Sequence, residues 1–323
     1  MISFIIIGRN ENWKITKCIQ SVLKTIQYNS LNNSEVIYID SKSSDDSLER
    51  VKQFESLKIF QLTGAYNAAI ARNLGVEKSR GDILFFIDGD MEILPEFLSL
   101  VYHERDGLTY PFVSGQLKNF NYDENAFFIN NTWQYSSVLN GDKYFATTGG
   151  IFLIERKIWE SVGGMDHRFK RGQDLEFALR IAQKGFKILR KKEIIANHHT
   201  ISYTHKTRLW KTLFSGDISY SNSFLLRKHI LNPQVYLKIA KSNYTLLGFF
   251  SFLILSVLMH QFYLLIGYFI VLGIKIYKQK KRNLLDIIEL FLFYPIRDLF
   301  FLFYLFAPIK KMNSSDIQYT QIQ

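Results

Sequence analysis

Apolar and polar positions follow two different periods over the first hundred residues. Short apolar runs that suit strands buried on both faces lie at Phe4–Ile7, Glu35–Ile39, Lys58–Leu62 and Asp82–Asp88. Between these runs, apolar residues recur at helical spacing, as in the segment from Trp13 to Ile26. This alternation predicts an α/β fold with a mostly parallel central sheet flanked by helices.

Each of the four predicted strands ends at or near a glycine or an aspartate, namely Gly8, Asp40, Gly64 and Asp88. In open α/β sheets, ligands bind outside the carboxyl ends of the strands. If the strands are parallel, the four positions lie at one edge of the sheet, where a single nucleotide can touch them all. The pattern therefore predicts a nucleotide-binding sheet.

The fourth predicted strand ends in two carboxylates on either side of a glycine, Asp88-Gly89-Asp90. Successive side chains of a straight strand point to opposite faces, but a glycine lets the backbone bend so that both carboxylates approach one cation. Mg²⁺ and Mn²⁺ bind carboxylate and phosphate oxygens together. The motif predicts a metal–diphosphate site, although taken alone it also fits a polar turn after a strand.

Residues 103–147 are rich in aromatic side chains, Trp133 among them, interspersed with Asn and Gly. Two interpretations are open for this segment. It forms a second, antiparallel layer whose aromatic side chains are core, or it forms the wall of a cleft on which sugar rings stack. A further apolar strand is predicted at Ile151–Ile154.

Apolar residues repeat at helical spacing after residue 172, and Gly185 marks the end of this predicted helix. Acidic residues in the first turn of a helix often complement its dipole. Asp174, held rigidly in that turn and partly exposed, also meets the requirements of a general base. His198, His199 and His205 follow the helix, and each is either structural or a candidate ligand for a metal or a diphosphate.

Tyr244–Tyr277 is almost uninterrupted apolar sequence, broken by His260-Gln261. Two arms of about 16 residues each reach about 24 Å at 1.5 Å per residue, against a hydrocarbon core of ~30 Å. Basic residues flank both ends, which predicts a membrane hairpin with cytoplasmic ends. For Leu284–Pro308, which contains charges and Pro295, we expect a broken helix that lies at the interface or packs on the hairpin, with a third span as the alternative. A soluble helical domain over residues 244–308 is the other interpretation.

Composition narrows the class of protein. Of the 323 residues, 47% are hydrophobic, and the net charge is +11. The basic residues cluster where the chain turns apolar, which favours the negatively charged cytoplasmic leaflet over a nucleic acid as partner. The single cysteine, Cys18, leaves no intramolecular disulfide or thiolate zinc cluster to be built. The first residues read as a strand without a basic leader, so we expect a cytosolic catalytic part.

With these residues in hand, the chain resembles glycosyltransferase family 2, with the GT-A fold, over residues 1 to about 230. The matching segments come in the family's order: Ile5-Ile6-Ile7-Gly8-Arg9-Asn10-Glu11, Asp40-Ser41-Lys42-Ser43-Ser44-Asp45, Ala71-Arg72-Asn73-Leu74-Gly75, Asp88-Gly89-Asp90, Gly163-Gly164-Met165-Asp166 and Gln173-Asp174-Leu175-Glu176. A chance turn no longer explains the two aspartates. The chain departs from the family pattern at Gly8 (usually proline), Ser41 (frequently aspartate) and Gln173 (commonly glutamate).

The resemblance implies a role for each matched residue on the donor side. The donor nucleotide would be bound by Gly8, Asp40, Arg72 and Asp88, with Asp40 at the uracil or ribose. Asp90 and Asp88 would hold a divalent metal, Mn²⁺ or Mg²⁺. His198 or His199 would be a further metal ligand.

On the other side of the reacting bond, the resemblance implies that Asp174 is the catalytic base. Gln173, Glu176 and Trp133 would lie on the acceptor side. We therefore expect an inverting, metal-dependent glycosyltransferase that moves a sugar from a nucleotide-diphosphate sugar, with a UDP-sugar as the expected donor, to a hydroxyl of a lipid-linked or cell-envelope glycan. The alternatives are a polyprenyl-phosphate sugar transferase, whose anionic acceptor needs no base, and an inactive membrane scaffold that retains the fold.

The expected organisation is a GT-A catalytic domain over residues 1–230, with a nucleotide-binding half (1–100) and an acceptor-binding half (101–230). A membrane-associated helical region over residues 231–312 and a polar tail over residues 313–323 follow. The expected location is the cell membrane, with the catalytic domain in the cytoplasm. The expected partners are the nucleotide-sugar donor, the glycan or lipid-linked glycan acceptor and membrane lipid, with no nucleic acid.

Overall fold

The computed structural model describes the chain except for residues 135–137, 146, 148, 203–206, 280–282 and 310–315. It divides into two compact units, Met1–Thr204 with Lys311–Gln323, and His205–Lys310. The predicted boundary at residue 230 is therefore placed too late. Residues after 205 join the second unit because their helices pack within it, as where Ser223 Oγ donates to the carbonyl of Phe301 at 2.9 Å.

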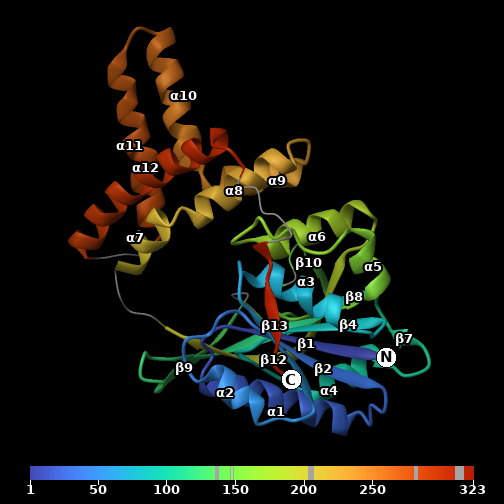
Figure 1. The fold of residues 1–323 in the computed structure, drawn as a ribbon. Helices are drawn as coiled ribbons and strands as arrows, with labels where there is room; N and C mark the ends of the chain where they lie inside the picture. The colour runs from blue at the N-terminus through green and yellow to red at the C-terminus, as the bar shows by residue number, and fades with distance from the viewer. Residues whose placement is uncertain (135–137, 146, 148, 203–206, 280–282, 310–315) are drawn as a thin grey trace. The chain divides into compact units, whose positions relative to one another are not determined.

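The first unit is built on one large sheet, whose strands run in the order β10-β12-β8-β11-β4-β1-β2-β3-β13, with β5 paired to β12 and β9 paired to β8 (Figure 1). Two short strands form a separate ribbon, β6 (Tyr102–His103) and β7 (Gly107–Leu108). The strands of the large sheet are β1 (Ile2–Gly8), β2 (Ser34–Asp40), β3 (Leu57–Leu62), β4 (Ile83–Asp88), β5 (Met91–Ile93), β8 (Phe112–Tyr122), β9 (Phe128–Trp133), β10 (Lys143–Phe145), β11 (Phe152–Glu155), β12 (Ile188–Ile201) and β13 (Tyr319–Gln321).

The sheet is mixed, so the prediction of a mostly parallel sheet is wrong for its second half. Strands β1, β2, β3 and β4 are parallel, as the sequence predicts. Beyond β4, strand β11 runs antiparallel to both β4 and β8, and β9 runs antiparallel to β8. The predicted second layer is also wrong, because β8, β9 and β10 extend this same sheet. A short turn such as that between β8 and β9 allows only antiparallel pairing.

Helices cover both faces of the sheet (Figure 1). The helices of one face are α1 (Trp13–Tyr28), α2 (Ser47–Lys52) and α4 (Pro95–Val101). The helices of the other face are α3 (Ala68–Lys78), α5 (Arg156–Ser161) and α6 (Gln173–Gln183). Because successive side chains of a strand alternate between faces, Phe4 and Ile6 of β1 enter the first core and Ile5 enters the second.

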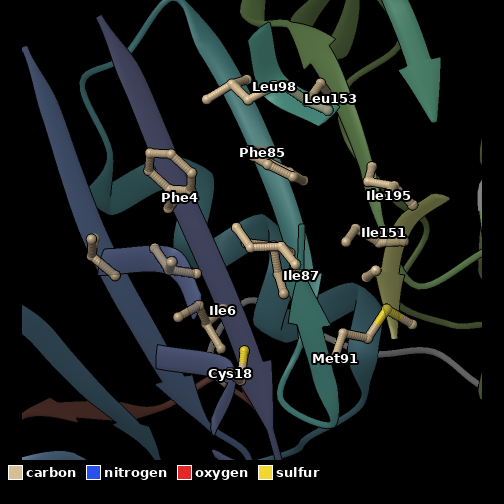
Figure 2. Packing of buried hydrophobic residues seen from close by; sticks show 14 of the residues in the cluster. Phe4, Ile6, Cys18, Phe85, Ile87, Met91, Leu98, Ile151, Leu153 and Ile195 are labelled. Carbon is tan, nitrogen blue, oxygen red and sulfur yellow. The ribbon is translucent and has the colours of Figure 1, made fainter. Parts of the chain in front are cut away.

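The first core fills the space between the central strands and α1 and α4. Figure 2 shows Phe4, Ile6, Phe85 and Ile87 projecting from β1 and β4 to the same side of the sheet. The Phe4 and Phe85 rings lie 5.5 Å apart. Full burial of such side chains contributes roughly 1.5–3 kcal/mol each, which fixes β1 and β4 side by side.

The polar tail, which the sequence left without predicted structure, returns to the first unit. Strand β13 pairs antiparallel with β3, and the amide of Thr63 donates to the carbonyl of Gln318 at 2.8 Å. A side chain at Gly64 would lie 2.3 Å from the carbonyl oxygen of Asp316. Glycine at the end of β3 therefore admits the C-terminal segment, which covers an otherwise unpaired sheet edge.

The second unit is helical. Its helices are α7 (Thr207–Phe214), α8 (Asp217–Lys228), α9 (Pro233–Ser242), α10 (Tyr244–Leu258), the 3₁₀ turn η1 (Phe262–Leu265), α11 (Ile266–Tyr277) and α12 (Leu284–Phe306). The predicted break at His260-Gln261 is confirmed, because α10 ends just before it and η1 begins just after it. Figure 1 shows α10 and α11 side by side.

The helix predicted to break at Pro295 is continuous from Leu284 to Phe306. Proline removes one backbone hydrogen bond, but packing of buried Tyr294 and Phe301 holds the helix on both sides of it. Two charges of this segment pair with each other: Arg297 Nη2 lies 2.5 Å from Asp298 Oδ1, and Thr245 Oγ1 donates to Asp298 Oδ2 at 2.6 Å.

Among the described residues, no single helix has both the length and the hydropathy needed to cross a membrane. Helices α9 and α10, which bend by 85° at Asn243, satisfy that test when they are taken together.

Candidate donor and metal site

The carboxyl ends of three parallel strands meet at one edge of the sheet. Gly8 is paired with Asp40, and Ile7 with Asp88, in the register of β1 with β2 and β4. The turns after these strands are joined too, because the amide of Gly89 donates to the carbonyl of Ile7 at 2.8 Å. The structure thus brings Gly8, Asp40 and Asp88 together as the sequence predicts, whereas Gly64 contacts the C-terminal segment instead.

Asp40 is fully buried and orders the turn that follows β2. Its Oδ2 accepts hydrogen bonds from the amide of Ser43 (2.9 Å) and from Gln61 Nε2 (3.2 Å), and its Oδ1 accepts one from the Tyr38 hydroxyl (3.2 Å). Gly8 is required beside it, because a Cβ there would lie 2.9 Å from the Tyr38 hydroxyl oxygen. A direct contact of Asp40 with a nucleotide stays a prediction.

Asp88 forms an ion pair with Arg72 of α3. Arg72 Nη2 donates to Asp88 Oδ1 at 2.5 Å, and the arginine is only 3% exposed. Burial raises the pKa of Asp88 to about 6, although the charge of Arg72 opposes this rise. The charge of Asp90 raises the pKa of Asp88 further, because two like charges repel.

Asp90 is joined to β12 through His198. The distance from His198 Nε2 to Asp90 Oδ2 is 3.2 Å, and Lys14 Nζ lies 4.0 Å from the same oxygen. Burial by itself would raise the pKa of Asp90, but the hydrogen bond and charge of His198 hold it below its ordinary value. Burial by itself would lower the pKa of His198, but the hydrogen bond and charge of Asp90 raise it above its ordinary value. The pair therefore favours an ionised Asp90 beside a protonated imidazole.

Glu11 adds a third carboxylate to this edge. Lys14 Nζ lies 2.5 Å from Glu11 Oε2, one turn along the chain. Burial raises the pKa of Glu11 to about 7, and the charge of Asp90 adds to this rise, while Lys14 opposes it. The main-chain amide of Glu11 donates to Ser47 Oγ at 2.9 Å, which ties the loop after β1 to the start of α2.

The two adjacent histidines of β12 have different surroundings, because neighbouring strand residues face opposite sides. His199 Nε2 lies 3.0 Å from Glu92 Oε2, and its Nδ1 lies 3.0 Å from the Tyr122 hydroxyl. Its ring also packs against Trp13. His198 is therefore the histidine whose side chain contacts Asp90, and a metal-ligand role for either histidine stays a prediction. His205 lies outside the described residues.

The acceptor-side residues at the start of α6 differ in accessibility. Asp174 is half-buried, and it forms no hydrogen bond or ion pair with other residues in the described parts of the chain. Glu176 is fully buried and paired with Arg180, whose Nε lies 2.7 Å from Glu176 Oε1. Arg180 Nη2 also donates to the carbonyl of Gly164 at 2.7 Å. Glu176 therefore cannot contact an acceptor as expected, and instead joins α6 to the loop after α5.

That loop is joined to α3 as well. Asn73 Nδ2 donates to the carbonyl of Met165 at 2.8 Å, and Asn73 Oδ1 accepts from its amide at 2.9 Å. Gly164 has a φ of 74°, and a Cβ there would lie 2.8 Å from Asn73 Oδ1. Glycine at residue 164 therefore allows the loop before α6 to contact Asn73 of α3. Helix α3 also carries Arg72, so one helix contacts both Asp88 and the loop that leads to Asp174.

The remaining predicted residues lie apart from this network. The Oε1 atom of Gln173 is buried without a hydrogen-bond partner in the described structure. Trp133 ends β9, is partly exposed, and pairs in register with Lys118 of β8. Their acceptor roles stay predictions.

Sequence reasoning missed Lys14, Gly150 and Asn119. Lys14 had a local signal, because residues three apart on a helix are neighbours and Glu11 precedes it by three. Gly150 and Asn119 had none: a Cβ at Gly150 would lie 2.0 Å from Asp88 Oδ2, and Asn119 Oδ1 lies 2.9 Å from His198 Nδ1. Both contacts depend on pairings between strands that are distant in the chain.

Comparison with known proteins agrees with this geometry. Residues 3–163 match the family described as Glycosyl transferase family 2. Glycosyltransferase AglE of Haloferax volcanii is 26% identical over 61% of this chain and 66% of its own length, just under two thirds. A dolichyl N-acetyl-alpha-D-glucosaminyl phosphate 3-beta-D-2,3-diacetamido-2,3-dideoxy-beta-D-glucuronosyltransferase of Methanococcus voltae is 28% identical over 72% of this chain and 75% of its own.

Among solved structures, residues 1–349 of S. aureus TarS superpose with a TM-score of 0.50 at 15% identity, covering 69% of this chain and 64% of that one. This likeness supports a mixed α/β fold of the GT-A type, with a central sheet and flanking helices. The family match covers the strands that carry Gly8, Asp40, Asp88 and Asp90. Residues 3–163, just under half of the chain, therefore match a glycosyl transferase family 2 domain, and the relatives that match a longer stretch of the chain are named as glycosyltransferases.

Proposed function

We propose that the chain transfers a sugar from a nucleotide-diphosphate sugar, with a UDP-sugar as the expected donor, to a hydroxyl of a lipid-linked or cell-envelope glycan. The observation that carries this proposal is the pair Asp88 and Asp90 at the carboxyl end of β4, held by Arg72 and His198. A lipid-linked acceptor is supported by the Methanococcus voltae relative, whose name specifies a dolichyl-phosphate sugar as acceptor.

The carboxylates fit a divalent cation shared with a diphosphate. Among the described residues, no group of three or more His, Cys, Asp or Glu side chains is arranged to hold a metal ion. Mg²⁺ and Mn²⁺ commonly bind one or two carboxylates together with substrate phosphates. Glycine at residue 150 lets the Asp88 carboxylate approach the backbone closely, since a Cβ there would lie 2.0 Å from Asp88 Oδ2, and that oxygen has no hydrogen bond within the described structure. Asp88 and Asp90 would therefore hold Mn²⁺ or Mg²⁺ together with the diphosphate oxygens, while His198 stays hydrogen-bonded to Asp90.

The bound cation would stabilise negative charge on the leaving diphosphate as a Lewis acid. The chain's own residues would do the rest. Arg72 fixes the direction of the Asp88 carboxylate, and Asp174 accepts the proton of the acceptor hydroxyl as the new bond forms. Asp174 suits this task because no cation in the described structure pairs with its carboxylate. Direct displacement by the hydroxyl inverts the anomeric centre.

The second unit would attach the enzyme to the cell membrane, with the catalytic unit in the cytoplasm. Large apolar side chains are exposed along α10, η1 and α11, including Leu258 (72%), Phe262 (66%) and Tyr263 (64%). Soluble proteins rarely expose so large a contiguous apolar surface. Basic residues adjoin the hairpin, as at Lys241 before α10 and Lys278 after α11, where they would meet anionic lipids.

A thermal-shift panel of nucleotide sugars with and without Mn²⁺ tests donor and metal together. A ligand at about 100 times its Kd stabilises the folded state by roughly 2.7 kcal/mol. We expect a UDP-sugar to raise the melting temperature more with Mn²⁺ than without it, and Asp90→Asn to remove the Mn²⁺-dependent part. A wild-type protein that shows no metal-dependent shift with any nucleotide sugar would contradict the proposal.

The stability of the metal-free protein should fall as the pH rises from 5 to 8. The pKa values of Asp88 and Glu11 are raised to about 6 and about 7, so the folded state holds protons that the unfolded state has released. The stabilisation is full below pH 4 and is lost as the pH passes through the raised pKa values, by roughly 3 kcal/mol at most for each group. Urea unfolding across this range measures it.

Glu11→Gln should flatten this pH dependence, because the amide does not ionise. Mn²⁺ should reduce the loss of stability at pH 8, since a cation stabilises ionised carboxylates. A free energy of unfolding that rises between pH 5 and 8 in the metal-free protein would contradict the raised pKa values.

Asp174→Asn should lower the rate of transfer by about 10²–10⁴-fold, because a general base contributes that much to proton transfer. The thermal shift caused by the donor should stay unchanged, since the variant leaves the β4 carboxylates intact. Glu176→Gln is the matched control: it breaks a buried ion pair and should lower the melting temperature, which Asp174→Asn should not. Unchanged turnover in Asp174→Asn would remove this residue from the base role.

Replacing Leu258, Phe262 and Tyr263 with serine should reduce co-flotation with anionic liposomes at least about tenfold, because each buried apolar side chain contributes roughly 1.5–3 kcal/mol. The control replaces Phe127 and Ile129, which are exposed by 70% and 48% in the first unit. Equal loss of flotation in both variants, or none in either, would count against membrane attachment through α10 and α11.

A further inference from the structure

The register of three strands gathers polar side chains on one face of the sheet. Residues opposite each other in a ladder point to the same face. The first row across β12, β8 and β9 is His198, Asn119 and Thr132. The next row, two residues later in β12 and β8 and two residues earlier in the antiparallel β9, is Thr200, Asn121 and Asn130. We call these six residues the amide strip.

The other face of the same strands is aromatic and packed, which confirms the direction of the strip. Phe120 and Tyr122 of β8 lie 5.6 and 5.7 Å from the His199 ring, and Trp13 lies 5.1 Å from Tyr122. In contrast, Thr132 and Asn130 of the strip are exposed, and its other members are partly exposed. The strip is therefore a solvent-facing surface.

Hydrogen bonds connect the strip to the donor and metal site. Asp90 contacts His198, and His198 Nδ1 lies 2.9 Å from Asn119 Oδ1. Asn119 Nδ2 donates to Thr132 Oγ1 at 3.4 Å. The first row thus continues directly from the carboxylate expected to hold the metal, across two strand spacings, or roughly 10 Å.

The second row is joined to the first through Asn121. Its Nδ2 donates both to Asn130 Oδ1, at 2.7 Å, and to Thr132 Oγ1, at 3.1 Å. These bonds fix the side-chain rotamers before any ligand arrives, which lowers the entropy lost on binding. Within the described structure, Asn121 Oδ1, the Asn130 amide hydrogens and the Thr132 hydroxyl hydrogen remain unused. The strip thus offers both an acceptor and donors to solvent.

Alternating donors and acceptors on a surface suit sugar hydroxyls, because each hydroxyl donates one hydrogen bond and accepts others. Five of the six strip residues are uncharged, and the sixth, His198, is paired with Asp90. The strip therefore has no free cation to select a phosphate or a carboxylate. A neutral polyhydroxylated chain is the ligand that its chemistry matches.

We infer that the amide strip is the binding site for the acceptor glycan, with Asn121, Asn130 and Thr132 contacting sugar hydroxyls. The assignment of this saccharide as the acceptor rests on the proposed transferase function, while saccharide binding itself does not. An oligosaccharide on the strip has one end near Asp90, where the transferred sugar would arrive. The strip holds the glycan beyond the reacting residue, so its members are binding residues and not catalytic ones.

The test is retention of the fluorescently labelled full chain on a printed array of neutral oligosaccharides. The strip variant combines Asn130→Ala with Thr132→Ala. The matched control is Asn131→Ala, because Asn131 is an exposed amide on the same strand whose ladder partner is Phe120 of the aromatic face. We expect the wild type and the control to retain the same glycans, and the strip variant to bind them about tenfold or more weakly.

The donor thermal shift is measured on the same three proteins, which separates the two proposals. An unchanged shift in all three shows that the substitutions leave the fold and the donor site intact. If the donor shift is present but the wild type retains no glycan, or the strip variant retains as much as the control, the strip assignment is overturned and the donor site stands. If glycans are retained without any donor shift, the strip stands and the transferase proposal fails.

Discussion

Buried negative charge at the carboxyl edge of the sheet is the constraint on which this site depends. Asp88, Asp90 and Glu11 converge there, and for Asp88 and Glu11 both burial and repulsion from Asp90 oppose ionisation. The charges that offset them come from separate elements: Arg72 from α3, Lys14 from α1 and His198 from β12. A buried carboxylate that loses its partner is strongly destabilising. The three acids can therefore lie together only when α1 and α3 pack on the sheet and β12 pairs with β5 beside Asp90.

The same arrangement explains why the site is suited to a cation and a diphosphate. The protein balances its carboxylates only in part, because the pKa of Asp88 and that of Glu11 stay raised despite their cationic partners. A divalent cation would complete the balance, and a diphosphate would complete the cation's ligands. On the acceptor side, neutral amides continue from His198 outward. The donor site is thus lined by charged side chains, whereas the expected glycan site is lined mainly by neutral ones.

Much of this could be predicted from the sequence because it is encoded locally. The four parallel strands follow from apolar runs, and the residues that end them follow from chain order alone. Helix α6, with Asp174 in its first turn, follows from helical spacing and a terminal glycine. The break between α10 and α11 at His260-Gln261 is also local. Periodicity reports which residues are buried, but not which strand lies next to which.

Only the tertiary structure decided the features that depend on strand neighbours. The sheet is mixed because β11 inserts antiparallel between β4 and β8, and the tail adds β13, although neither pairing has a local signal. The choice of His198 over His199 depends on the register of β12 with β8, which shifts at irregularities between Arg190 and Ala196. A shift of one residue would exchange the two faces. The sequence by itself determined the acids of this site, and the long-range register decided which side chains surround them.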